Sequence, residues 1–422
     1  MADPGGLDRQ VAHLLAGAHG PDEAAAAAVA ERARQVLRPA GALARLDQLA
    51  VWLAAWQGSS RPAVRRPAAV VFAADHGVAA SGVSAYPAEV TAAMVKALGE
   101  GVATASVLAA QVGATLDVVD VGVGEPTGDL TREPALDPAR FRACVHAGRD
   151  AVAGLDTDLL VLGEMGIGNT TAAAAVTAIL LGRSGEASTG RGTGVDDAGL
   201  ARKRAAVESA RRRVGAAAPL EVLRQAGGAE LAALAGAALE ARLRRLPLVL
   251  DGFVVTAAVA PLELLRAGAL ANAVAGHRSP EPGHTALLER LGLAPLLDLG
   301  MRLGEASGAL AAVPLLRLAA AAVTEVATFA EWGLEPPAGL WTTPDAPRPG
   351  PLDSPSGGPD SGGQGSGLPG GRDSGGRGSG LPGGSDGGGR GSGLPGGPDS
   401  GDRGSGLPGG AGCGGSWGRC RS

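Results

Sequence analysis

The sequence predicts an α/β fold in which a mostly parallel sheet is flanked by helices (Rossmann-like), with a small helical domain and a disordered Gly/Ser/Pro-rich C-terminal tail. Three observations lead to this prediction. Short β-rich runs alternate with Ala/Leu-rich stretches of helical character, and strands that alternate with helices form parallel sheets. Ala-rich segments without obvious strands flank this region. From about residue 335 onward, the chain consists mostly of Gly, Ser, Pro, Asp and Arg.

The predicted elements follow in order along the chain. The segments 24–58 and 287–333 carry apolar residues at helical spacing and are expected to pack together. Between them, four runs are predicted to be strands, over residues 68–72, 116–121, 158–162 and 246–250. We therefore predict a domain over residues 1–335, with a large α/β part at about 60–285 and a small helical part at about 1–59 and 286–335, followed by a tail over 336–422.

The tail should be disordered, because it has too few apolar side chains to offset the entropy of ordering. Within it, the heptapeptide Gly-Ser-Gly-Leu-Pro-Gly-Gly begins at Gly365, Gly378, Gly391 and Gly404, a period of 13 residues. This period matches no solenoid, and glycine does not recur at every third position as collagen requires. The repeat is therefore predicted to be flexible and of low complexity.

Composition narrows the possible functions. The chain has 422 residues, 37 basic and 42 acidic, and its net charge of −5 does not favour nucleic-acid binding. Three scattered cysteines fit neither a disulfide framework nor a zinc site, so a cytoplasmic location fits best. The N-terminal residues lack the pattern of a signal peptide. The longest apolar run, 170–181, is shorter than the roughly 20 residues that cross a bilayer, so no membrane span is expected.

Each predicted strand is followed at once by an acidic residue with a glycine close by. The pairs are Asp75 and Gly77, Asp120 and Gly122, Glu164 and Gly163, and Asp251 and Gly252. In open α/β sheets, ligands bind outside the carboxyl ends of the strands. We therefore expect the functional site at this edge of the sheet.

The segment 163–171, Gly-Glu-Met-Gly-Ile-Gly-Asn-Thr-Thr, is built like an anion site between a strand and an Ala-rich helix. Gly166 and Gly168 would let the backbone approach a ligand, and Asn169 or Thr170 would cap the helix, whose first N–H groups face the anion. The segment is neither a Walker A loop nor a dinucleotide fingerprint. A tight strand-to-helix turn without function is the alternative.

A second glycine loop, Gly190-Arg191-Gly192-Thr193-Gly194, precedes Lys203 in a predicted helix. Two such loops suggest that one phosphate is held from two sides. Lys203 would then supply a positive charge to a phosphomonoester that is shielded from water. The alternative is an ordinary solvated lysine on a helix.

The cluster 276–284, Gly-His-Arg-Ser-Pro-Glu-Pro-Gly-His, contains Ser279 between two histidines. It lacks the Gly-x-Ser-x-Gly elbow of a serine hydrolase, and its two prolines indicate a rigid loop. Ser279 is therefore expected to donate its hydroxyl to an anion. Neither His277 with His284 nor His76 has the spacing of a metal site, so we expect neither a metal nor a cofactor.

The fourth motif, over residues 301–309, places Glu305 in an otherwise apolar helical region. A carboxylate in apolar surroundings has a raised pKa, which suits a general base that takes a proton from a weakly basic nitrogen near neutral pH. The alternative is an ion pair between Glu305 and Arg302.

Together with Asp75-His76-Gly77-Val78 and the segment 84–91, Ser-Ala-Tyr-Pro-Ala-Glu-Val-Thr, these four motifs resemble the nicotinate-nucleotide:dimethylbenzimidazole phosphoribosyltransferase family. The resemblance runs from about residue 43 to about residue 333, and several motifs agree over eight or more consecutive residues. Such agreement is far more specific than one glycine loop.

The resemblance implies a homodimer whose subunits share each active site, and it implies roles for several residues. Glu305 would be the catalytic base and Glu164 a second carboxylate that lines the site. The nucleotide phosphate would be held by Gly166, Gly192, Thr193, Gly194, Lys203 and Ser279, and the aromatic base would lie near Ser84, Tyr86 and Met165. Where the family usually has Gly-Glu-Gly, this chain has Gly304-Glu305-Ala306, a change that matters only if Ala306 needs a positive φ, which costs of order 1 kcal/mol for a residue with a β-carbon.

The reaction implied is the transfer of phosphoribose from nicotinate mononucleotide to 5,6-dimethylbenzimidazole, which gives α-ribazole phosphate for the lower ligand of cobalamin. Glu305 would take the N–H proton of the base while the other ring nitrogen attacks the anomeric carbon. Two alternatives stay open: the same chemistry with adenine or a phenol, because an apolar pocket discriminates weakly among flat rings, and a silent nucleotide-binding protein. The presence of Glu305 argues against the second.

Overall fold

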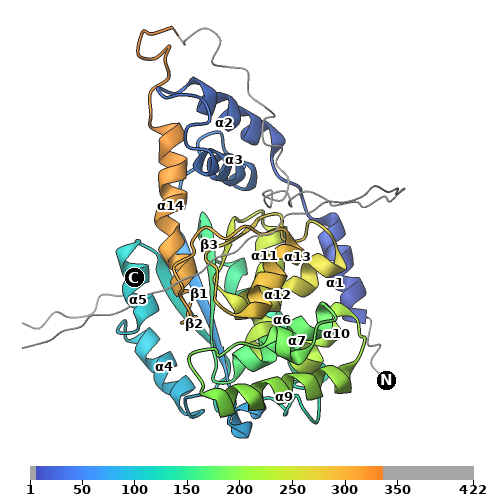
Figure 1. Cartoon of the computed structure of the whole chain (residues 1–422). Helices are drawn as coiled ribbons and strands as arrows, with labels where there is room; N and C mark the ends of the chain where they lie inside the picture. Colours follow the sequence, from blue (N-terminus) through green and yellow to red (C-terminus); the bar gives the residue numbers. More distant parts are fainter. Residues whose placement is uncertain (1–5, 336–422) are drawn as a thin grey trace, which may run out of the picture. The chain divides into compact units, whose positions relative to one another are not determined.

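The computed structural model describes residues 6–335, and the predicted tail at 336–422 lies outside the described residues. The centre of the described part is a sheet of five parallel strands in the order β2-β1-β3-β4-β5 (Figure 1). The strands are β1 (Pro67–Ala74), β2 (Thr115–Gly122), β3 (Leu159–Met165), β4 (Leu248–Leu250) and β5 (Ala273–Ala275). The predicted fold class, a parallel sheet flanked by helices, is confirmed.

The four predicted strands coincide with β1 to β4, and β5 is an addition. β1 is buried along its whole length, as expected for a strand in the middle of a parallel sheet. β2, at one edge of the sheet, is only partly buried. The sequence of β5 is Ala-Val-Ala, which is too short and too Ala-rich to stand out from the helical stretches around it.

Helices cover both faces of the sheet. Successive side chains of a strand point to opposite faces, so Val70, Phe72 and Leu160 belong to one apolar cluster, whereas Val71 and Val161 belong to another. The first cluster is completed by α1 (Gly6–Gly17), α6 (Pro138–Ala153), α7 (Asn169–Leu180), α9 (Asp197–Val214), α10 (Pro219–Ala226), α11 (Ala229–Leu243), α12 (Phe253–Leu265) and α13 (Pro282–Leu291). The second is completed by α2 (Glu23–Gln35), α3 (Arg45–Gln57), α4 (Val90–Gly99), α5 (Thr104–Gln111) and α14 (Ser307–Thr324).

The helices from the two Ala-rich segments lie together in part. α3 packs against α2 and α14, beside one end of α14 in Figure 1. By contrast, α1 contacts α10, α11 and α12, and α13 contacts α7 and α12. The boundaries between a large α/β part and a small helical part stay a prediction.

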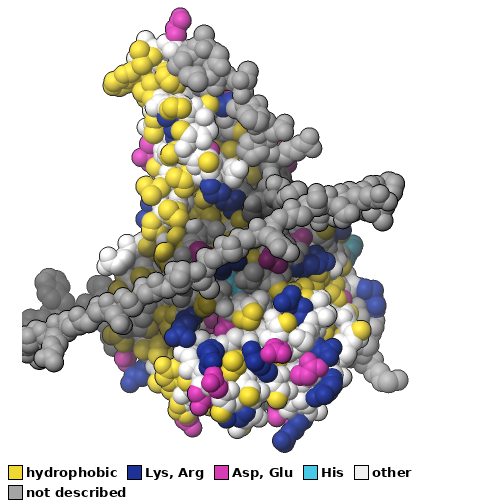
Figure 2. Space-filling model, viewed as in Figure 1, with side chains coloured by type: hydrophobic (Ala, Val, Ile, Leu, Met, Phe, Trp, Pro, Cys, Tyr) yellow, Lys and Arg dark blue, Asp and Glu magenta, His cyan; other side chains and the backbone are white. Residues whose placement is uncertain are grey.

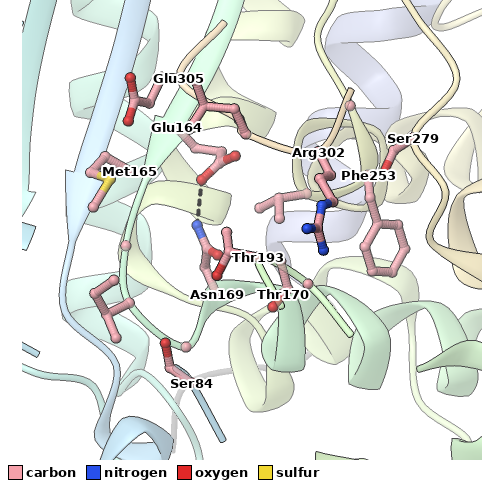
Figure 3. Close-up of a pocket in the computed structure, with 18 of the residues that line it drawn as sticks. Ser84, Glu164, Met165, Asn169, Thr170, Thr193, Phe253, Ser279, Arg302 and Glu305 are labelled. Carbon is pink, nitrogen blue, oxygen red and sulfur yellow. Dashed lines mark hydrogen bonds between the residues drawn. The ribbon is translucent and has the colours of Figure 1, made fainter. Parts of the chain in front are cut away.

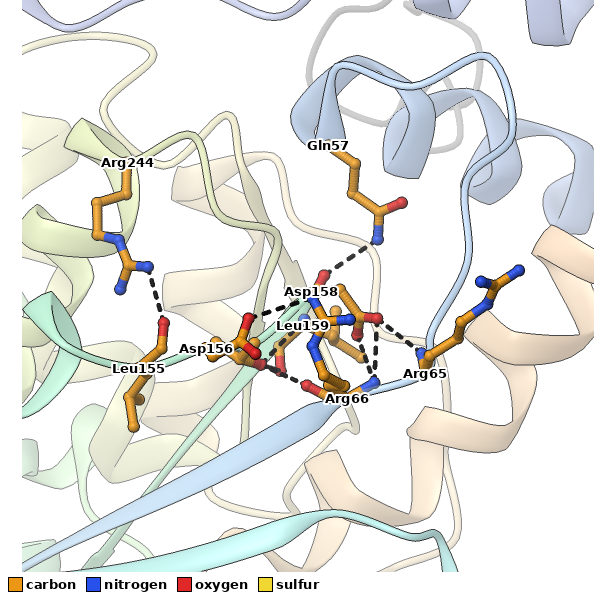
Figure 4. Close-up of polar contacts among 9 residues, drawn as sticks. Gln57, Arg65, Arg66, Leu155, Asp156, Asp158, Leu159 and Arg244 are labelled. Carbon is orange, nitrogen blue, oxygen red and sulfur yellow. Dashed lines mark hydrogen bonds and ion pairs between the residues drawn. The ribbon is translucent and has the colours of Figure 1, made fainter.

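The amino ends of β1 and β3 are tied together at the edge of the sheet shown in Figure 4. The carboxylate of Asp158 accepts hydrogen bonds from the backbone N–H groups of Arg65 (2.8 Å) and Arg66 (3.0 Å). Gln57 at the end of α3 donates to the Asp158 carbonyl oxygen (3.0 Å), and Arg244 after α11 donates to that of Leu155 (2.8 Å). These bonds fix the starts of the strands and leave their carboxyl ends for the site.

Two helical stretches among the described residues are long and apolar enough to cross a membrane by length and composition. They are Val90–Gln111, which contains α4 and α5, and Ser307–Thr324, which is α14. More than half of the apolar window in α14 is buried inside the fold. The absence of a membrane span stays a prediction.

Candidate active site

A cavity of about 530 Å³ opens at the carboxyl ends of the central strands (Figure 3). Its walls come from the end of β3, the loop before α9, the loop before α13 and the loop before α14. Of the residues predicted for the site, those that line the cavity are Ser84, Tyr86, Glu164, Met165, Gly166, Gly168, Asn169, Gly192, Thr193, Ser279 and Glu305. Gly194 and Lys203 do not line it.

The turn after β3 differs from the prediction in how the next helix begins. Gly168 is the N-cap of α7, with a φ of 98°, and no side chain caps the helix. The predicted cap by Asn169 or Thr170 is therefore wrong. The Asn169 amide instead donates to the Glu164 carboxylate, as the dashed line in Figure 3 shows. The positive φ, which glycine adopts without strain, turns Asn169 back toward β3.

Glu164 is a buried carboxyl group at the end of β3. Burial raises its pKa well above the usual value, and the negative charges of Asp251, Glu230 and Glu305 add to this effect. The hydrogen bond from Asn169 acts in the opposite direction. The charged form of Glu164 is thus destabilised by its surroundings.

Glu305 lies on a left-handed turn directly before α14. Gly304, Glu305 and Ala306 have φ angles of 87°, 59° and 68°, a conformation that is strained for residues with a β-carbon. The Glu305 N–H donates to the Glu164 carbonyl oxygen (3.2 Å), which joins the turn to β3. Burial raises the pKa of the Glu305 carboxyl, and so does the charge of Asp251.

The alternative of an ion pair between Glu305 and Arg302 does not hold in the structure. Figure 3 shows Glu305 and Met165 on one side of Glu164 and the Arg302 guanidinium on the other, near Phe253 and Thr193. Among residues 6–335, the Arg302 guanidinium has no hydrogen-bond or ion-pair partner. It therefore brings an uncompensated positive charge to the cavity, as a site for an anion requires.

The second glycine loop already holds an anionic group of the protein. The N–H groups of Gly190 and Gly192 donate to the two carboxylate oxygens of Glu281, at 3.0 and 2.7 Å. A β-carbon on Gly190 would lie 2.6 Å from these oxygens, so a larger residue there would displace the Glu281 carboxylate. These two amides therefore bind a carboxylate where the sequence predicts that the loop faces a phosphate.

Lys203 lies behind this loop and is not solvated. Its side chain is buried, and its ammonium group donates to the Thr170 hydroxyl (2.8 Å). Burial lowers the pKa of Lys203, and the nearby charge of Glu281 opposes that shift. A β-carbon on Gly192 would lie 2.9 Å from the ammonium nitrogen, so the charge is separated from the cavity only by the thin loop.

Ser279 and His284 do not form a nucleophile and base. The Ser279 N–H donates to Nδ1 of His284 (3.0 Å), and Nε2 of His284 faces the Thr256 hydroxyl (3.1 Å). Burial, together with the charge of His277, lowers the pKa of His284 to about 3. Both ring nitrogens are thus engaged away from the Ser279 hydroxyl, and the role of Ser279 as a donor to an anion stays a prediction.

The chain is similar to known proteins over most of its described residues. The model of a family described as "Phosphoribosyltransferase" matches residues 18–334. The nicotinate-nucleotide–dimethylbenzimidazole phosphoribosyltransferase of Mesorhizobium japonicum is 52% identical over 314 residues, 74% of this chain and 93% of the relative. The enzyme of the same name from Jannaschia is 50% identical over 322 residues, 76% of this chain and 95% of the relative. The chain belongs to this phosphoribosyltransferase family.

The fold is shared with a solved member of the family. The crystal structure of nicotinate-nucleotide–dimethylbenzimidazole phosphoribosyltransferase from Thermus thermophilus is 44% identical and has a TM-score of 0.70. The similarity covers 75% of this chain and 100% of that chain. The described part of this protein therefore corresponds to a whole phosphoribosyltransferase of the family.

Sequence reasoning missed several groups that shape the phosphoribosyltransferase cavity. Glu281 and Arg302 both belong to motifs that the sequence analysis examined. Glu281 was treated only as a neighbour of Ser279, and Arg302 only as a partner for Glu305. Phe253 also lines the cavity; it follows the marked pair Asp251 and Gly252, but its own residue type gave no sign of a role in the site. His277, considered in the sequence only as a partner of Ser279 or as a metal ligand, also lines it. Within residues 6–335 there is no cluster of three possible metal ligands.

Proposed function

We propose that the chain transfers the phosphoribosyl group of nicotinate mononucleotide to 5,6-dimethylbenzimidazole, giving α-ribazole phosphate and nicotinate for the lower ligand of cobalamin. The single observation that carries this proposal is the separation of charge in the cavity. Two buried carboxyl groups with raised pKa values, Glu164 and Glu305, lie at one side, and the unpaired guanidinium of Arg302 lies at the other. A base-catalysed transfer from a phosphorylated donor needs a carboxylate that takes up a proton and a positive charge that holds the phosphate.

The phosphate is held at the end of the cavity lined by Gly192, Thr193, Ser279 and Arg302. Because Glu281 occupies the amides of Gly190 and Gly192, the phosphate receives the hydroxyl groups and the guanidinium rather than those two N–H groups. Lys203 adds positive charge from behind the loop, where low polarity screens it less than water would. Gly166, Gly168 and Asn169 shape the floor between the two ends, and Gly194 sets the course of the loop beside Arg302.

The flat base lies at the opposite end, against Met165 and the segment that leads into α4. Ser84, Tyr86, Val90 and Met94 line this end of the cavity. Thioether and other apolar side chains adapt to a flat ring without specific hydrogen bonds. The pocket therefore takes up an aromatic base by burial of its faces, while its N–H points to a carboxylate.

The reaction is a displacement at the anomeric carbon. Glu305 removes the N–H proton of the benzimidazole, and the other ring nitrogen forms the new bond to C1′ of the ribose. The bond from C1′ to the pyridinium nitrogen breaks on the opposite face, its electron pair leaves with nicotinate, and the configuration inverts. Glu164 stabilises the positive charge that develops on the ribose, and holding the two substrates in line supplies much of the acceleration.

Product analysis tests this proposal. Purified protein is mixed with nicotinate mononucleotide and 5,6-dimethylbenzimidazole, and nicotinate and α-ribazole phosphate are quantified. Glu305→Gln is expected to lower kcat by about 100-fold, because an amide accepts no proton. Turnover of adenine or a phenol in preference to the benzimidazole would favour the first alternative, and tight nucleotide binding without any product would favour a silent binder.

We propose that the protein acts as a homodimer. Large apolar side chains are exposed along the adjacent helices α5 and α14, among them Val107 and Leu318, and Figure 2 shows apolar side chains along α14. Exposed apolar patches of this kind mark protein interfaces. Light scattering should give the mass of two chains, and Leu318→Arg should give that of one. A dimer that persists in Leu318→Arg would place the interface elsewhere.

We also propose that the protein is cytoplasmic and takes small-molecule substrates without binding nucleic acid. The cysteine content and the net charge of −5 support this. Cell fractionation is the direct measurement, with the activity expected in the supernatant after the membranes are pelleted.

A further inference from the structure

Asp251 is a fully buried carboxylate that lies behind the cavity rather than in its wall. It follows β4 directly, and neighbouring Gly252 lines the cavity whereas Asp251 does not. A buried carboxylate is expensive unless the protein supplies partners for its charge. The partners that the fold supplies to the Asp251 carboxylate therefore indicate its role.

The carboxylate of Asp251 caps helix α14 from another part of the chain. Its Oδ1 atom accepts hydrogen bonds from the N–H groups of Gly308 (2.8 Å) and Ala309 (2.9 Å) in the first turn of the helix. α14 has no side-chain cap of its own, because its N-cap residue is Ala306. A negative charge at the N-terminus of an 18-residue helix is further stabilised by the helix dipole.

This cap acts on the turn that carries Glu305. Gly304, Glu305 and Ala306 are all left-handed, and the helix that Asp251 caps begins at the next residue. Without a group that holds the first N–H donors of α14 in place, two residues with β-carbons would relax toward negative φ. The geometry of the proposed base therefore depends on Asp251.

His277 packs on the other side of Asp251. Its Nε2 atom lies 3.7 Å from Asp251 Oδ1, and its ring covers Gly308 so closely that a β-carbon there would lie 2.0 Å from the ring. Burial raises the pKa of Asp251, and His277 and the N–H groups of the helix act in the opposite direction. His277 and the helix N–H groups thus offset only part of the effect of burial on the pKa of Asp251.

Charged and titratable groups on several elements lie around the turn that carries Glu305. Asp251 follows β4, Glu164 lies on β3, His277 follows β5, and Arg302 precedes Glu305 in its own loop. The negative charge of Asp251 raises the pKa of Glu305, and the Ala105 N–H at the start of α5 opposes this. Arg302 points away across Glu164 (Figure 3).

We propose that Asp251 is a positioning residue for Glu305: it fixes the left-handed turn and, through its negative charge, sets the strength of Glu305 as a base. This inference rests on the proposed function of Glu305. It adds a residue outside the cavity whose charge controls the proton transfer inside it.

The experiment separates the charge of Asp251 from its role as a cap. Asp251→Asn keeps an oxygen that accepts the N–H groups of Gly308 and Ala309 but removes the charge. Asp251→Ser is a second neutral variant, which keeps a hydroxyl oxygen on a shorter side chain. The pH profile of kcat is measured for the wild type, both variants and Glu305→Gln. Asp298→Asn is the matched control, because it removes an exposed carboxylate from the loop before α14 that also carries Glu305.

The expected result is a shift of the acid limb of the kcat profile to lower pH in Asp251→Asn and Asp251→Ser. The sign follows because a base far from negative charge loses its proton at lower pH. On the alkaline plateau, kcat should fall by roughly threefold to tenfold, because a weaker base drives proton transfer less. Asp298→Asn should keep the wild-type profile.

The other outcomes decide against the role of Asp251 alone or against the roles of both Asp251 and Glu305. Suppose that the acid limb is present in the wild type and absent in Glu305→Gln, but does not move in a folded Asp251 variant. The inference about Asp251 is then wrong, while the proposed role of Glu305 stands. A limb that Glu305→Gln retains refutes the role of Glu305 and the inference with it. If neither Asp251 variant folds, as judged by circular dichroism, the carboxylate serves the fold itself and the inference is wrong.

Discussion

Gly163 and Ala306 are in such close backbone contact that a β-carbon on Gly163 would lie 2.3 Å from the Ala306 nitrogen. The contact presses the end of β3 against the turn before α14, and each of these segments carries one of the two proposed catalytic carboxylates. Ala306 stands where the family usually has glycine, and its φ of 68° means that the chain bears the cost expected for a β-carbon there.

Gly163→Ala should therefore damage both stability and activity. The added methyl group has no free space, and overpacking of this kind costs about 1–3 kcal/mol. We expect a fall of this size in the free energy of unfolding in urea, together with a lower kcat as Glu305 is displaced. Gly154→Ala is the control, because a β-carbon there meets no atom within 4 Å. Equal stability of the two variants would contradict the close contact.

Replacement of Glu281 should loosen the glycine loop. In Glu281→Gln only one oxygen remains to accept the N–H groups of Gly190 and Gly192, so one buried donor loses its partner. The free energy of unfolding is expected to fall by about 1–3 kcal/mol. Glu289→Gln removes the same charge from an exposed position on α13 and should be neutral. Urea unfolding of the two variants side by side makes the comparison.

Lys203→Met should separate binding from stability. A methionine fills the same buried space without the cost of burying an ammonium group, so the free energy of unfolding should change by less than about 1 kcal/mol. Affinity for nicotinate mononucleotide should fall by roughly 10-fold to 100-fold, because a charge next to the phosphate is lost. Lys96, with an exposed side chain, offers the control Lys96→Met. Calorimetric titration measures the affinity, and unchanged binding would remove Lys203 from the site.

Glu164→Gln should make the protein more stable at pH 8 and less active. Burial raises the folded-state pKa of Glu164 above its value in the unfolded chain. Its contribution to stability is therefore complete below the unfolded pKa and is lost as the pH rises through the folded pKa. Glutamine stays neutral throughout. The gain over wild type in urea unfolding should be larger at pH 8 than at pH 5, while kcat falls by about 100-fold. An equal gain at both pH values would show that Glu164 is not destabilised by its charge.

The sequence was informative about the sheet and about where the site lies. Runs rich in Val and Leu marked β1 to β4, and acidic residues after these strands marked the edge that holds the cavity. β5 was not predicted, because the pattern Ala-Val-Ala does not distinguish a strand from a helix. Which residues form strands is largely a local property, and local patterns predicted it well.

The partners of the polar groups could not be predicted in the same way. Gly192 and Glu281 are 89 positions apart, and only the fold brings the carboxylate to the loop amides. A glycine loop looks the same in sequence whether its N–H groups face a ligand or a side chain of the protein. Likewise, Asn169 suits a helix cap by residue type, but Glu164 competes for its amide.

The ties at the amino ends of the strands have a consequence for how this enzyme can change. Asp158, Arg65 and Arg66 secure β1 and β3 at the edge opposite the cavity, through bonds that involve none of the residues lining it. Substitutions in the loops around the cavity therefore leave this anchor intact. New acceptor bases can be explored by evolution or by library selection at one edge of the sheet, while the other edge preserves the scaffold.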